Sequence, residues 1–168
     1  MFIRSAPELY AHAIAIEREA AERYAELASR MQDEGREDLG RVFQLLADME
    51  SEHLQTLEAR TLDVALPAIA EGRYNWLDAG APETAARELV FRLMTPRMAL
   101  AIALDAELRA QAFFERVFMT CEDPALRALA REMAADEQEH VALLARILEA
   151  TPDPAALAST PIFTTLTP

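Results

Sequence analysis

Apolar residues recur every three to four positions over four long stretches of this chain, which is the period of a helix with one buried face. The pattern predicts long helices over about residues 6–31, 36–60, 96–120 and 124–149. Polar residues occupy the opposite face of each stretch, so the four helices are expected to pack against one another around a shared core.

Residues typical of a helix N-terminus support three of these four helices. Ser5 and Glu8 form a capping box at the beginning of the first helix. A proline follows Thr95 and another follows Asp123, so each residue can cap a helix whose first turn contains proline. These signals fix where the first, third and fourth helices begin.

The connections predict how the helices are arranged. A short polar break at residues 32–35 makes the first two helices an antiparallel hairpin, and the last two form a second one. Residues 61–82 lose the helical period and contain prolines and glycines, as expected for a long crossover, and a short amphipathic helix follows at about 82–94. The predicted fold is all-α, a four-helix bundle of two antiparallel hairpins joined by a long crossover with a short extra helix.

Length and composition favour a single globular domain. Apolar residues make up 52% of the 168 residues, enough for one substantial core. We assign residues 1–150 to the bundle domain and residues 151–168, which are rich in threonine and broken by proline, to an extended C-terminal tail.

Charge and hydropathy exclude several classes of partner. The chain carries 29 acidic and 16 basic residues, a net charge of −13, and has no basic cluster for a phosphate backbone. No apolar run approaches the roughly 20 residues needed to span a bilayer. We therefore expect no nucleic-acid partner, no membrane partner and a cytoplasmic location.

The candidate chemistry is a Glu-x-x-His motif that occurs twice. Glu50 and His53 lie in the second predicted helix, and Glu137 and His140 lie in the fourth. Residues three apart on a helix share a face, and both pairs fall on the apolar stripe rather than the polar one. Acids and histidines are costly to place on a buried face, and a metal site would offset that cost.

The first and third helices each add one inward glutamate. Glu17 and Glu107 have mainly apolar helical neighbours, and each precedes an aromatic residue, Tyr24 or Phe114, by seven positions. Four carboxylates in one core would repel one another, and two divalent cations would cancel their charge. Four glutamates and two histidines without a thiolate suit iron first, and manganese and zinc also fit. Tyr24 could donate a hydrogen bond to a metal ligand or relay electrons, but we interpret it as a core tyrosine that finds one hydrogen bond.

With these residues in this order, the chain resembles the ferritin-like superfamily, and within it the rubrerythrin and bacterioferritin branches, over about residues 6–150. The resemblance implies a di-iron centre. Glu50 and Glu137 would bridge the metals, Glu17 and Glu107 would be terminal ligands, and each metal would take one histidine. Two features depart from rubrerythrins. Their further ligand glutamate, one turn after the third-helix one, is Ala110 here, and a rubredoxin-like iron domain is absent because Cys121 is the only cysteine.

The sequence leaves three functions open. The leading hypothesis is an oxidoreductase in which Fe(II) reduces dioxygen or peroxide and an external electron donor restores it. The second is an iron-oxidising protein for iron storage or handling. The third is a structural or partner-binding bundle with a vestigial site. We also expect a homodimer or another small homo-oligomer, because a monomer would expose the amphipathic crossover helix and the apolar tail.

Overall fold

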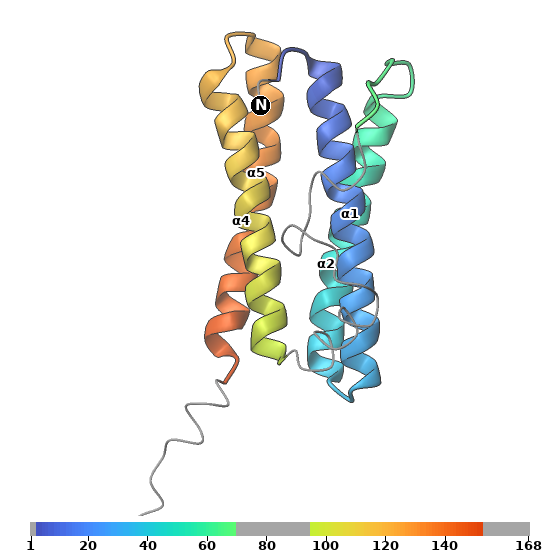
Figure 1. Ribbon diagram of the computed structural model, residues 1–168, viewed down its shortest axis with the longest axis vertical. Coiled ribbons are helices and arrows are strands. Elements are labelled where there is room, and N and C mark those ends of the chain that lie inside the picture. The colour runs from blue at the N-terminus through green and yellow to red at the C-terminus, as the bar shows by residue number, and fades with distance from the viewer. Residues whose placement is uncertain (1–2, 70–94, 153–168) are drawn as a thin grey trace, which may run out of the picture.

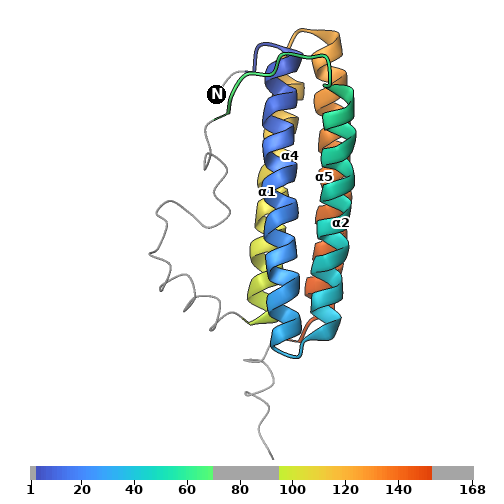
Figure 2. The ribbon, with the colours of Figure 1, turned by 90° about the vertical axis from the view of Figure 1, so that its right-hand side faces the viewer.

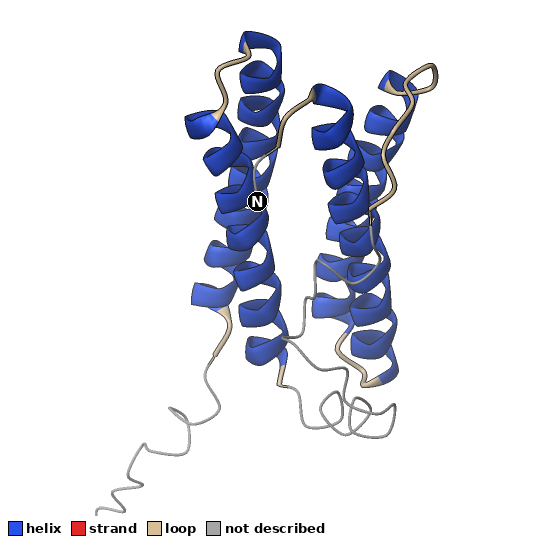
Figure 3. Ribbon diagram, turned by 45° about the horizontal axis from the view of Figure 1, so that its top comes forward, coloured by secondary structure: helices blue, strands red, loops and turns tan. Residues whose placement is uncertain are grey.

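The computed structural model describes residues 3–69 and 95–152. This part of the chain contains four helices. Figure 3 shows helices joined by loops and no strand among the described residues. The helices are α1 (Ala6–Asp33), α2 (Glu37–Arg60), α4 (Pro96–Thr120) and α5 (Pro124–Ala150). All predicted boundaries agree within two residues. The predicted short helix at 82–94 and the tail from residue 153 lie outside the described residues.

The helices form a four-helix bundle, as predicted. The hairpin of α1 and α2 faces the hairpin of α4 and α5 (Figure 1). In the perpendicular view, α1 lies in front of α4 and α2 lies in front of α5 (Figure 2). Residues 61–69 leave the end of α2 toward the α1 side of the bundle, as the first part of a crossover. No helix within the described ranges is long and apolar enough to cross a membrane.

The turn between α1 and α2 requires a glycine. Gly35 has a φ of 73°, in the left-handed region that residues with a side chain rarely adopt. Its N–H donates to the carbonyl of Gln32 at 2.9 Å, and the N–H of Arg36 donates to Met31 at 2.7 Å. These two bonds are the Schellman pattern, which satisfies the last carbonyls of α1 and reverses the chain into α2.

A polar layer divides the core into two apolar clusters. One cluster lies toward the hairpin turn of α1 and α2, and its largest members are Tyr24, Met31, Phe43, Leu46, Leu100 and Leu144. The other lies toward the turn of α4 and α5 and includes Leu9, Leu57, Phe114, Leu126 and Met133. In every helix, the predicted ligand residues fall between the stretches that contribute to the two clusters. Packing on both sides therefore fixes the position of the polar layer along the bundle.

Replacing Phe43 with alanine should lower the free energy of unfolding by about 3–5 kcal/mol. The ring is fully buried and stacks on Tyr24 with centroids 6.2 Å apart, so its loss leaves a cavity. Urea unfolding followed by circular dichroism measures the change. Leu62→Ala is the control, because Leu62 is 83% exposed and should cost less than about 0.5 kcal/mol. Similar costs for the two variants would contradict this description of the core.

Candidate metal centre

The six predicted ligands lie in the polar layer, and all four helices contribute. Five of them are buried: Glu17, Glu50, Glu107, Glu137 and His140. The sixth, His53, keeps 31% of its side chain exposed. Carboxylates are almost never buried to this extent unless they are paired or bind a cation.

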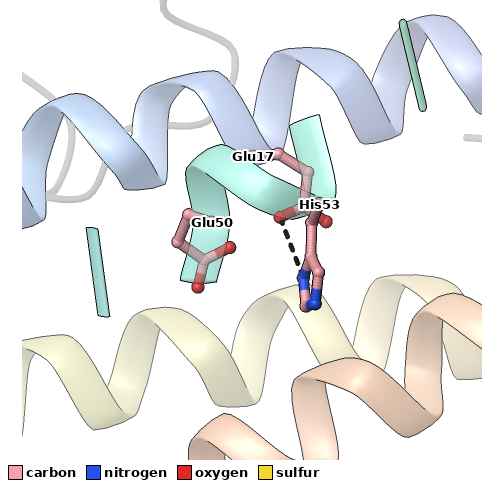
Figure 4. Close-up of side chains that lie close together, drawn as sticks. All are labelled: Glu17, Glu50 and His53. Atoms are coloured by element: carbon pink, nitrogen blue, oxygen red, sulfur yellow. Dashed lines mark ion pairs between the residues drawn. The ribbon is translucent and has the colours of Figure 1, made fainter. Parts of the chain in front are cut away.

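One group of potential ligands combines α1 and α2. It contains Glu17, Glu50 and His53, whose nearest donor atoms all lie within 4.8 Å of one another. The Nδ1 atom of His53 is 3.7 Å from Oε2 of Glu17. The dashed line in Figure 4 marks this ion pair. This group reaches solvent through the exposed edge of His53.

A second group combines α2, α4 and α5 and is entirely buried. It contains Glu50, Glu107 and His140, again with donor atoms within 4.8 Å of one another. The Nδ1 atom of His140 is 2.8 Å from Oε1 of Glu50 and 3.4 Å from Oε2 of Glu107. Three helices therefore converge on one imidazole nitrogen.

Glu50 belongs to both groups, which is the position that a bridging carboxylate would occupy. Glu137 belongs to neither, although its Oε2 atom is 3.7 Å from Nδ1 of His140. The bridging roles of the two glutamates stay predictions. The structure does bring Glu137 to the same imidazole as the second group.

The two histidines lie against each other across the seam of α2 and α5. Their rings stack with centroids 5.2 Å apart and an interplanar angle of 15°. His140 is buried and His53 is partly exposed, so the pair runs from the interior toward the surface.

The ionisation of the layer reflects the burial of its charges. Burial, reinforced by neighbouring carboxylates, raises the pKa of Glu17 and that of Glu137 well above the ordinary glutamate value. Burial alone would lower the pKa of His140, but the facing carboxylates outweigh it and raise the pKa to about 12. Burial would raise the pKa of Glu50, yet the contacts with His140 and Glu17 leave it lowered. These directions favour protonated carboxyls at Glu17 and Glu137 and a charged imidazole at His140.

The donor set fits divalent metal ions. Four buried atoms of the layer take part in ion pairs but make no well-aligned hydrogen bond within the described parts of the chain: Oε2 of Glu17, Oε1 of Glu50, Oε2 of Glu137 and Nδ1 of His140. Buried polar atoms are rarely left in this state, and these four belong to one small region. Carboxylate oxygens and imidazole nitrogens are ligands that iron, manganese and zinc accept.

Tyr24 makes the two halves of the site different. Its hydroxyl donates a hydrogen bond to Oε1 of Glu107, from a fully buried position. The prediction of a core tyrosine with one hydrogen bond is confirmed, and its partner is a predicted ligand. The matching position in the second half of the chain is Phe114, which has no hydroxyl to donate. The orientation of Glu107 is thus fixed by a residue that is not itself a predicted metal ligand.

Sequence reasoning missed one residue beside the site. Asp136 is half-buried, and burial raises its pKa while the charge of His53 opposes that rise. It directly precedes Glu137 in the sequence, and this position beside a predicted ligand is the signal that could have identified it.

His12 does not belong to the site. It is buried on another part of α1, with its ring 5.7 Å from that of Phe113 on α4.

Comparisons with known proteins identify a family model and a solved structure that this chain is similar to. The family model described as Rubrerythrin matches residues 8–148. A solved structure of an uncharacterized conserved protein from Magnetospirillum magnetotacticum MS-1 is 34% identical, with a TM-score of 0.79, over 90% of this chain and 98% of that chain. No curated protein matches the sequence.

In the metal-free protein, Glu17→Gln should weaken the loss of stability that accompanies rising pH. The raised pKa of Glu17 means that the folded state holds a proton that the unfolded state releases, so stability falls as pH rises above the unfolded value near 4.5. Glutamine cannot lose that proton. Urea unfolding at several pH values, in the presence of a chelator, measures how the free energy of unfolding changes with pH in the parent protein and in the variant.

The matched control is Glu52→Gln, because Glu52 is an exposed glutamate on α2. It should keep the pH dependence of the parent protein. Equal slopes for the parent and Glu17→Gln would contradict the protonated state assigned to Glu17.

Proposed function

Because the chain belongs to the rubrerythrin family, we propose that its buried layer binds two divalent metal ions, iron in the first instance, and that the loaded protein is an oxidoreductase acting on dioxygen or peroxide. One observation carries the proposal: Glu50 is shared by two groups of potential ligands, each of which contains one histidine. Metals held by these two groups would lie close together, because both groups include Glu50.

The residues have distinct roles in this proposal. Glu17, Glu50 and His53 hold one ion, and Glu50, Glu107 and His140 hold the other. Glu137 completes the charge balance, because four carboxylates cancel the charge of two divalent ions. Bound ferrous ions would supply the electrons that reduce the oxidant.

The surroundings favour a reaction with a small molecule. Five of the six ligands are buried, so a large substrate cannot reach them without displacing a helix. The exposed edge of His53 provides contact with solvent at one of the two groups. Dioxygen and peroxide are small enough to approach there. The burial of the other group protects its metal from water and from competing ligands.

Electrons must come from a donor outside these 168 residues. The sequence has a single cysteine and therefore no C-x-x-C pair for a rubredoxin-type iron. Ala110, one turn after Glu107, packs among the apolar residues of the second core cluster, so no carboxylate stands there to exchange with another ligand. We propose a reaction that depends on an external donor for each cycle.

The protein should bind about two divalent ions per chain, following the charge balance of its buried carboxylates. The double variant Glu50→Ala with Glu137→Ala should abolish binding, because it removes the shared ligand and half of the negative charge. Equilibrium dialysis with metal analysis after anaerobic Fe(II) loading measures the stoichiometry.

The matched control is the double variant Glu52→Ala with Glu139→Ala, which removes two exposed glutamates from the same helices. It should retain both ions. One ion per chain in the parent protein, or none while the helices remain intact, would contradict the paired site.

The ferrous protein should react once with peroxide or dioxygen and then stop. A rubredoxin-like donor should restore cycling, because the chain has no electron entry of its own within these residues. Stopped-flow oxidation followed by steady-state peroxide consumption, with and without the donor, measures both phases. Sustained turnover with a nicotinamide reductant alone would show an electron entry that the proposal lacks.

The variant Ala110→Glu tests the missing ligand. A carboxylate one turn after Glu107 should increase reactivity with peroxide if ligand exchange limits the parent protein. Unchanged reactivity, with metal content still at two ions, would show that ligand exchange does not limit the reaction.

A particle mass corresponding to a shell of many subunits would favour iron storage over catalysis.

A further inference from the structure

The turn between α4 and α5 borders a surface hollow of about 500 Å³. Phe118 in the last turn of α4 and Pro124, Ala128 and Ala135 from the first turns of α5 give it apolar walls. Residues 121–123 join the two helices at the top of Figure 1, and the structure describes all of them. The volume falls within the roughly 300–1,000 Å³ that is typical of small-molecule sites.

Two exposed arginines, one turn apart on α5, line the same hollow. They are Arg127 and Arg131, and like charges four residues apart on a helix repel each other. Among the residues that the structure describes, neither arginine has an ion pair. Asp123, one turn before Arg127, instead accepts hydrogen bonds from the N–H groups of Ala125 and Leu126. An anion placed between the two arginines would relieve their repulsion.

Glu132 also lines the hollow, but its carboxylate is engaged by another helix. Its Oε1 atom is 2.7 Å from a guanidinium nitrogen of Arg60 on α2. Because this ion pair compensates the charge of Glu132, the two arginines of α5 make the hollow positive. The rest of the molecule is different, since the whole chain has 29 acidic and 16 basic residues.

Packing positions one of the two arginines in advance. The guanidinium carbon of Arg127 lies over the ring of Phe118, 5.0 Å from its centroid, in a cation–π contact. Phe118 in turn packs against the second core cluster, so its ring is anchored. A guanidinium held in this way loses little freedom on binding, and its planar fork of N–H donors matches the oxygens of a phosphate group.

We propose that this hollow binds a small phosphate ester, with its phosphate group between Arg127 and Arg131. The organic group would lie against the apolar surface of Pro124, Ala128 and Ala135. Two guanidinium groups suit a phosphate with two negative charges better than a singly charged carboxylate. A small ligand is favoured over an acidic protein, because a chain with a net charge of −13 would repel such a protein over most of its surface.

The hollow is separate from the candidate metal centre. Ala135 and Glu137 are two residues apart on α5, so their side chains project from nearly opposite faces of the helix. Ala135 is exposed, whereas Glu137 is buried in the polar layer. A ligand in the hollow would therefore lie across α5 from the predicted metal ligands. This inference does not depend on the proposed function.

Calorimetric titration of the full chain with phenyl phosphate tests the site. The protein is used metal-free and freed of chelator, because phosphate binds iron and chelators are themselves anions. One molecule should bind per chain, and Arg127→Ala and Arg131→Ala should each raise the dissociation constant roughly tenfold, since each removes a charge-assisted contact. The matched control is Arg41→Ala, because Arg41 is an exposed arginine near the start of α2, and it should bind like the parent protein. Circular dichroism confirms that each variant is folded.

Other probes identify the class of ligand. Inorganic phosphate should bind several-fold more weakly than phenyl phosphate, because it covers none of the apolar wall. Equal affinities for the two would contradict the assignment of an ester. Tighter binding of an oligoglutamate peptide than of phenyl phosphate would overturn the proposal in favour of an acidic protein. Absence of phenyl phosphate binding would also overturn it, as would equal weakening by the Arg41→Ala control.

Discussion

The structure depends on the burial of four carboxylates within one layer of a helical bundle. Taking ionised acids out of water is so unfavourable that they must accept protons, pair with a cation or bind metal ions. In this protein, the raised pKa values of Glu17 and Glu137 favour their protonated forms, and the raised pKa of His140 favours a charged imidazole. Four buried atoms of the same layer take part in ion pairs without a well-aligned hydrogen bond, and their oxygen and nitrogen lone pairs are the kind that divalent metals accept. The apolar clusters on either side keep water away and hold these acids and histidines at one level of the bundle.

Internal repetition gives the site its approximate symmetry, and a few side chains then break it. Each hairpin contributes an inward glutamate and a Glu-x-x-His motif. However, Tyr24 donates a hydrogen bond to Glu107, while its counterpart Phe114 cannot donate to Glu17. His140 is buried, while His53 reaches the surface. One half is consequently enclosed and restrained, and the other is in contact with solvent. In the proposed oxidoreductase, this difference separates the position that meets a small oxidant from the one that is shielded.

The fold was largely predictable because helix periodicity and capping are local properties. Apolar spacing located all four helices, and Ser5, Thr95 and Asp123 accept the expected hydrogen bonds or precede the expected prolines. The six ligand candidates were also predictable, because acids and histidines on an apolar stripe are too costly to bury unless they bind a cation or one another. By contrast, the partner of Tyr24 lies 83 positions away, on another helix. Nothing in local spacing could identify that contact.

The sequence by itself determined which residues turn inward, since a helical period assigns each side chain to a face before any helix meets another. It also determined the chemistry of the layer, four carboxylates and two imidazoles, and hence the charge that must be compensated. Only the tertiary structure decided that Glu50 belongs to both ligand groups, that Glu137 belongs to neither, and that His53 rather than His140 reaches solvent. These features depend on how closely the hairpins approach and how they are rotated. Those distances are set by packing between residues far apart in the chain, which no periodicity within one helix records.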